Sequence, residues 1–121
     1  MANIKILLAE DDSNLGFVIK DNLGDRGYDI THCLNGLDAE HATYKDKYDL
    51  YLLDVMMPGM DGFAFLEEFD KLQNEIKSKS KVIMLSTSES FKDLNRANQS
   101  RYVYKFLNKP LNKPVLDAIN I

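Results

Sequence analysis

Short apolar runs of strand length alternate along this chain with segments of helical period, and this alternation limits the fold more than any other feature. The apolar runs cover residues 4–9, 28–33, 50–54, 82–85 and 103–107. Parallel strands need long crossover connections, which are usually helices. The alternation therefore predicts an α/β domain in which helices cover both faces of one five-stranded parallel sheet.

The segments between the first three runs carry helix signals. The first of them has one apolar stripe at helical spacing, formed by Leu15, Val18, Ile19 and Leu23. Gly27 follows this stripe, where a left-handed cap commonly ends a helix. Asn35 predicts the start of a second helix, which carries Leu37, His41 and Tyr44.

Three further helices are predicted in the second half of the chain. Asp61 and Gly62 open a helix whose apolar face is formed by Phe65, Leu66, Phe69, Leu72 and Ile76. Ser90 and Asp93 fit a capping box for a short fourth helix. A last short helix is expected over residues 112–121.

Composition limits the class of protein. A chain of 121 residues with 45% hydrophobic and 28% charged residues predicts one globular domain, spanning residues 1–121. The net charge is −4 and no basic stripe is present, so we expect no direct binding of nucleic acid. No apolar run approaches membrane-spanning length, so we expect no membrane contact. The single Cys33 cannot form an internal disulfide, which favours a cytoplasmic location.

Polar residues follow three of the apolar runs. Asp11 and Asp12 close the first, Asp54 closes the third, and Lys109 with Pro110 follows the fifth. Because ligands of open α/β sheets bind at the carboxyl ends of the strands, we expect these side chains to meet there. Carboxylates that lie close together repel one another, and Mg²⁺ relieves this by taking oxygen ligands. The pattern predicts a magnesium site.

Such a site also suits phosphoryl transfer. Asp54 is a candidate nucleophile that would form an aspartyl phosphate. Lys109 and the Ser86 hydroxyl, both at strand ends, would neutralise the phosphoryl oxygens. Pro110 would turn the chain sharply after Lys109, and a cis peptide bond is one way to form such a turn.

Structural explanations exist for several of these residues taken alone, whereas an acid such as Asp54 at the end of a buried strand has no obvious structural role. Asp11 and Asp12 would be favoured at a helix N-terminus by the helix dipole. Ser86 would cap a following helix, with Glu89 three residues later. Lys109 alone would be a solvated surface residue. The occurrence of all these strand ends in one chain favours the functional interpretation.

The motifs LLAEDD, LLDVMMPGMDG, VIMLSTS and FLNKP, in this order, resemble the receiver domains of two-component response regulators. The resemblance covers essentially the whole chain. It implies a flavodoxin-like (βα)5 fold, doubly wound, with strand order 2-1-3-4-5.

The resemblance also implies roles for individual residues. Asp54 would accept the phosphoryl group, and Asp12, Asp11, Asp54 and the backbone carbonyl of Met56 would hold Mg²⁺. Ser86, Thr87 and Lys109 would contact the phosphoryl group. Phe106, three residues before Lys109, falls at the switch aromatic of the family and would respond to the state of Ser86.

The implied function is a phosphorylation-dependent signalling switch rather than an enzyme acting on other molecules. The phosphoryl donor would be a sensor histidine kinase or a phosphotransfer protein. The face around Phe106, made by the fourth helix, fifth strand and last helix, would act on a downstream protein, a fused output domain or a second copy. Two alternatives stay open: a Mg²⁺-dependent phosphohydrolase with Asp54 as nucleophile, and an interaction module that is not phosphorylated.

Overall fold

The computed structural model describes residues 4–55, 57, 60–71, 80–86, 95–96, 99 and 103–108. The strands are β1 (Lys5–Ala9), β2 (Asp29–Cys33), β3 (Leu50–Asp54), β4 (Lys81–Ser86) and β5 (Val103–Asn108). The helices bounded within these ranges are α1 (Ser13–Asp25), α2 (Gly36–Lys45) and α3 (Gly62–Asp70). The predicted strands are therefore confirmed, with ends that differ by one residue at most.

All five strands belong to one parallel sheet in the order β2-β1-β3-β4-β5. The sheet prediction and the implied order are both confirmed. In the register of β1 and β3, Ala9 lies opposite Leu53. In the register of β3 and β4, Asp54 lies opposite Leu85. This register brings the carboxyl ends of β1, β3 and β4 to the same edge of the sheet.

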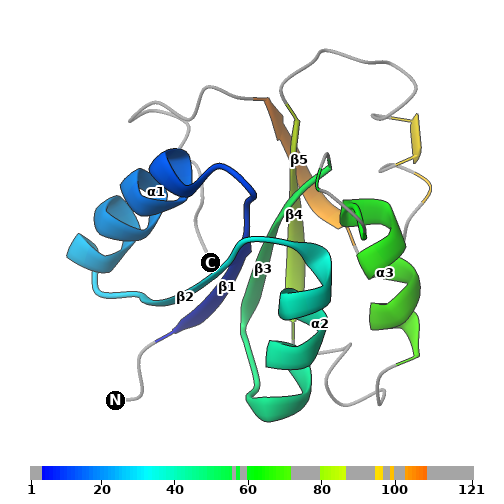
Figure 1. Cartoon of the computed structure of the whole chain (residues 1–121), viewed down its shortest axis with the longest axis horizontal. Helices are drawn as coiled ribbons and strands as arrows, with labels where there is room; N and C mark the ends of the chain where they lie inside the picture. Colours follow the sequence, from blue (N-terminus) through cyan, green and yellow to red (C-terminus); the bar gives the residue numbers. More distant parts are fainter. Residues whose placement is uncertain are drawn as a thin grey trace.

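Alternate residues of each strand enter two separate cores, one on each face of the sheet. Ile6 and Leu8 of β1 pack toward α1, whereas Leu7 and Ala9 pack toward α2 and α3. Figure 1 shows α1 on one side of the strands and α3 on the other. Every residue of β3 is buried, as expected for a central strand covered on both faces.

The sequence signals for helix ends are confirmed where the structure describes them. Asn35 caps α2 with its side chain, which accepts from the backbone N–H of Asp38 at 2.8 Å. Asp61 caps α3 in the same way, accepting from Ala64 N–H at 2.8 Å. Gly27 has a φ of 94°, so it takes the left-handed conformation predicted after α1.

The second helix packs through a face that the apolar pattern did not indicate. Leu37 and Tyr44 are 52% and 65% exposed, while Ala39 and Thr43 are buried against the sheet. Small residues on this face let α2 approach closely. Some of the expected helical residues lie outside the described residues. They are Leu72 and Ile76 of the third helix, Ser90 and Asp93 of the fourth, and the whole of the expected last helix, residues 112–121.

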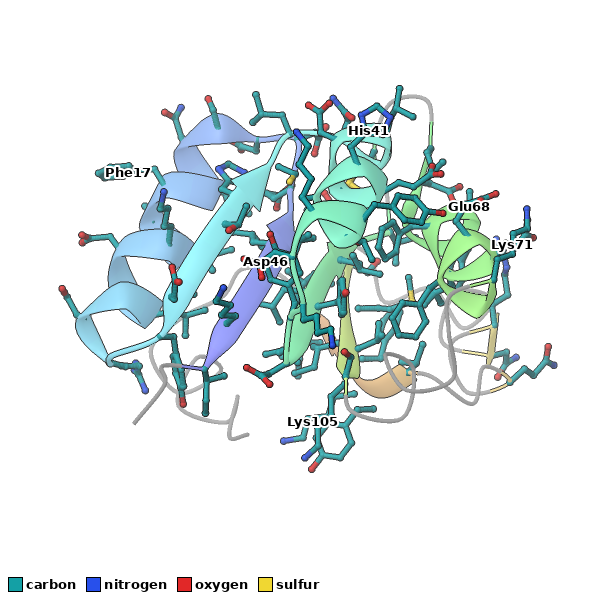
Figure 2. All side chains as sticks on the ribbon, turned by 90° about the horizontal axis from the view of Figure 1, so that it is seen from below. Phe17, His41, Asp46, Glu68, Lys71 and Lys105 are labelled. Atoms are coloured by element: carbon teal, nitrogen blue, oxygen red, sulfur yellow. The ribbon has the colours of Figure 1, made fainter. Side chains whose placement is uncertain are left out.

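The outer surface of the first helix also carries large apolar side chains. Phe17 is 68% exposed, and Figure 2 shows its ring pointing away from the sheet.

Within the part of the chain that the structure describes, no helix has both the length and the apolar character needed to cross a bilayer.

Candidate acidic site at the carboxyl edge of the sheet

Asp54 is the last residue of β3, and only 3% of its surface is exposed. The chain is held closely on either side of it. The N–H of Val55 donates to the carbonyl of Leu85 at 2.8 Å, and the N–H of Gly62 donates to Val55 at 3.2 Å. A Cβ on Gly62 would lie 2.7 Å from the Asp54 carbonyl oxygen, so only glycine lets α3 begin this close to β3.

Two further acids join Asp54 at this edge. Glu10 and Asp11 directly follow β1, and carboxylate oxygens of Glu10, Asp11 and Asp54 all lie within 4.8 Å of one another. Glu10 is fully buried, whereas Asp11 is exposed. We call these three residues the acid group. Its members come from two neighbouring strands, which the parallel register places side by side.

Asp12 lies outside the acid group and serves a different purpose. It is the N-cap of α1, and its Oδ1 accepts from the backbone N–H groups of Asn14 and Leu15 at 2.9 and 3.2 Å. The helix-end explanation left open by the sequence therefore describes Asp12 well. Of the two aspartates predicted after the first strand, the structure brings only Asp11 together with Asp54.

Glu10 was missed by sequence reasoning, although the strand register contains the signal that finds it. Because Ala9 of β1 lies opposite Leu53 of β3, the next residues, Glu10 and Asp54, are level with each other. The sequence alone does not state this register. If the last apolar residues of the two runs, Ala9 and Leu53, are taken to lie opposite each other, Glu10 and Asp54 follow at the same level.

Ser86 ends β4 and is 1% exposed. Its partner in the sheet is Asn108, the residue directly before Lys109 in the chain. Phe106 of β5 is partly buried and packs against the core on the side of α2 and α3. Four other predicted residues lie outside the described residues: Met56, Thr87, Lys109 and Pro110.

The neighbouring thiol does not extend the acid group. Cys33 ends β2 and is buried, and its backbone carbonyl accepts from the N–H of Glu10 at 3.0 Å. Burial raises the pKa of the Cys33 thiol, with a smaller contribution from Asp38. The thiol is therefore protonated near neutral pH and is a poor metal ligand.

The donors of the acid group suit a hard divalent cation. All three are carboxylates, and two of them are buried. Oxygen ligands of one octahedral Mg²⁺ lie about 2.9 to 4.2 Å apart, from the usual Mg–O distance. A group already within 4.8 Å needs little contraction to reach this geometry. The residues thus fit Mg²⁺ in both chemistry and spacing.

Comparison with known proteins agrees with this architecture. The family model "Response regulator receiver domain" matches residues 6–120. The transcriptional regulatory protein RprY of Bacteroides fragilis is 41% identical over 73 residues, which are 60% of this chain and 31% of that protein. The probable transcriptional regulator ycf29 of Porphyra purpurea is 33% identical over 114 residues, which are 94% of this chain and 53% of that protein.

Among solved structures, the chemotaxis protein CheY4 of Vibrio cholerae superimposes with a TM-score of 0.86 at 25% identity. The alignment covers 97% of this chain and 95% of that one. By contrast, the chain spans about a third to a half of the length of the two curated relatives. The fold, its sheet order and the match over residues 6–120 lead to one conclusion: the chain belongs to the response regulator receiver domain family of two-component signalling.

Proposed function

We propose that this receiver domain is a switch operated by phosphorylation of Asp54. A sensor histidine kinase or a phosphotransfer protein would supply the phosphoryl group from a phosphohistidine. An Asp54 carboxylate oxygen attacks phosphorus, the new O–P bond forms, and the N–P bond to the imidazole breaks. The observation that carries this proposal is the burial of Asp54 at a strand end, within 4.8 Å of two more carboxylates.

The acid group is the proposed Mg²⁺ site. Glu10, Asp11 and Asp54 would provide its protein ligands, and the backbone carbonyl of Met56 remains a predicted fourth. When bound, the cation neutralises charge on the carboxylates and on the incoming phosphoryl oxygens. Asp12, although predicted as a ligand, would contribute by capping α1 and so fixing the start of the helix behind Asp11.

The remaining predicted residues have proposed roles around the phosphoryl group. Ser86 is buried at the end of the adjacent strand, and its hydroxyl would donate to a phosphoryl oxygen. Lys109 would supply a positive charge, Thr87 would line the pocket, and Pro110 would turn the chain after Lys109. Phe106 would change its packing when Ser86 is drawn toward the phosphoryl group. Each role remains a proposal.

The output of the switch is proposed to pass through the face around β5. Added negative charge at Asp54 would shift an equilibrium between inactive and active conformations. The altered face, including Phe106, would then contact a downstream protein, a fused output domain or a second copy of the domain. Two relatives are named as transcriptional regulators, which supports control of transcription as the final output. A cytoplasmic location remains part of the proposal.

The test is the intact mass of the protein after incubation with acetyl phosphate and Mg²⁺. We expect wild type to gain one phosphoryl group and to lose it again by hydrolysis. Asp54→Asn should gain none, because the amide is not a nucleophile. Asp46→Asn, which alters an exposed acid after α2, is the matched control and should behave as wild type. A phosphoryl group on Asp54→Asn, or none on wild type with any phosphoryl donor, would refute the proposal.

A further inference from the structure

The imidazole of His32 contacts the backbone of the acid group. His32 belongs to β2, and its Nε2 lies 2.9 Å from the carbonyl oxygen of Glu10. A carbonyl oxygen only accepts hydrogen bonds, so Nε2 must carry the hydrogen in this contact. His32 is half-buried, and it therefore donates to Glu10 from a position shielded on one side by protein.

Helix α1 packs directly against the ring. A Cβ on Gly16 would overlap the Cε1 and Nε2 atoms of His32 and would lie 2.8 Å from its Nδ1. The ring thus occupies the space that any side chain at position 16 would need. Gly16 is itself fixed by the first turn of α1, where its N–H donates to the carbonyl of Asp12 at 2.9 Å.

The carbonyl that His32 contacts belongs to the peptide unit joining Glu10 to Asp11. The N–H of Glu10 is also bound, donating to Cys33 at 3.0 Å. Strand β2 therefore fixes both backbone polar groups of Glu10, one through Cys33 and one through His32. The orientation of this peptide unit constrains the directions in which the two side chains leave the backbone, and it thereby constrains how their carboxylates approach Asp54.

We propose that His32 is a positioning residue of the Mg²⁺ site, acting through the Glu10 carbonyl, with Gly16 as the surface that holds its ring. The inference rests on the proposed function, because it assigns the acid group to Mg²⁺. Partners that orient metal ligands typically change metal affinity by about 10- to 100-fold when removed. We expect a loss at the lower end of this range, because His32 contacts the backbone of the ligand rather than its carboxylate.

Two substitutions separate the hydrogen bond from the packing of the ring. His32→Phe keeps an aromatic ring against Gly16 and removes the donor, so Mg²⁺ affinity should fall about 10-fold. His32→Gln restores an N–H donor and should recover most of the loss. His41→Phe makes the same chemical change on the exposed face of α2 and should leave the affinity unchanged.

A third substitution tests the same contact from the helix. Gly16→Ala forces the ring away from its place without altering His32, and should therefore weaken Mg²⁺ binding as His32→Phe does. In the double variant Gly16→Ala, His32→Phe, the two losses should be less than additive, because both act through one hydrogen bond. If His32→Phe does not fold, Gly16→Ala and His32→Gln still provide the comparison.

The experiment is calorimetric titration of each folded variant with MgCl₂, with circular dichroism and the metal-free melting temperature as checks of folding. Weaker binding by His32→Phe and Gly16→Ala, with recovery in His32→Gln, supports the proposal. Equal Kd values for wild type and His32→Phe would overturn it, as would a loss in His32→Gln as large as in His32→Phe. Failure of wild type to bind Mg²⁺ would instead refute the magnesium site of the proposed function, and this inference with it.

Discussion

The two edges of the sheet both carry acids, but the surroundings of those acids differ. At the amino edge, Asp46 and Asp49 are exposed and contact Lys5. Asp46 accepts from the Lys5 Nζ at 2.7 Å, and Asp49 accepts from the Lys5 backbone N–H at 2.9 Å. At the carboxyl edge, Glu10 and Asp54 are buried and lie within 4.8 Å of each other and of Asp11.

This difference separates acids that serve the fold from acids that serve a ligand. Exposed acids at the amino edge cost little, since water and a nearby lysine solvate them. Burying several carboxylates in one group is unfavourable because each loses water and repels the others. Such a group is retained where a cation or a reaction needs it.

Packing should be tighter at the carboxyl edge than at the amino edge, and glycines report this. Gly36 starts α2, just after the carboxyl end of β2, and a Cβ on it would overlap the backbone oxygen of Met60. Gly24 lies near the end of α1, just before the amino end of β2, and a Cβ on it meets nothing within 4 Å. Gly36→Ala should therefore lower the free energy of unfolding by about 2–3 kcal/mol. Gly24→Ala, inside α1, should raise it by about 0.5–1 kcal/mol.

Urea denaturation of the two alanine variants and wild type measures both values. A Gly36→Ala variant as stable as Gly24→Ala would mean that the loop carrying Met60 moves aside easily. The claim of a closely packed carboxyl edge would then be wrong.

A buried polar group away from the carboxyl edge distinguishes burial from function. The Tyr51 hydroxyl, carried by the second residue of β3, is buried; Thr43 and Ser80 lie near it, but it makes no hydrogen bond of good geometry with any described residue. Burying an unsatisfied polar group is costly, so Tyr51→Phe should stabilise the protein by about 1 kcal/mol. Removing this hydroxyl should leave Mg²⁺ binding unchanged, because it lies away from the acid group.

The same residue predicts a dependence on alkaline pH. Burial raises the pKa of Tyr51 to about 12, from a usual value of 10.0. The folded state therefore binds this proton more tightly than the unfolded state does. The resulting stability is fully present below pH 10 and is lost as the pH rises toward 12. Melting temperatures of wild type and Tyr51→Phe should diverge further above pH 10; parallel curves would contradict the assignment.

The smallest effect is expected at the amino edge. The hydrogen bond from Lys5 lowers the pKa of Asp46, helped by the backbone N–H of Lys47. Asp46 thus contributes stability above its unfolded pKa and loses it as the pH falls through its folded pKa. Both side chains are exposed, so Asp46→Asn should lower the melting temperature only slightly at neutral pH. The difference from wild type should vanish in acid and shrink in high salt; a large, salt-insensitive loss would contradict the contrast between the edges.

Much of the fold follows from short-range patterns. Apolar runs located five strands, and Asn35, Asp61 and Gly27 marked helix ends because a cap is a local interaction. The face of α2 was less predictable. Its buried side depends on how closely the helix approaches the sheet, and this favoured small Ala39 over Leu37.

The candidate site was predictable in kind but not in every member. Asp54 and Asp11 were identified because acids, a hydroxyl and a lysine follow several apolar runs of one chain, and this combination favours a ligand site. Glu10 was missed because its membership depends on the register between β1 and β3. The contact of His32 with Glu10 joins two strands and a helix, and the spacing of these residues in the sequence does not indicate it.

The melting temperatures of Asp54→Asn and Asp46→Asn, measured without metal and then with Mg²⁺, test most directly whether the buried acids are kept for a cation. If the buried acids repel one another and are kept for a cation, Asp54→Asn should melt above wild type without metal. It should also lose most of the Mg²⁺-dependent stabilisation, which wild type and Asp46→Asn retain. An Asp54→Asn variant that melts below wild type without metal, and gains as much stability from Mg²⁺, would show that these acids neither repel one another nor hold the cation.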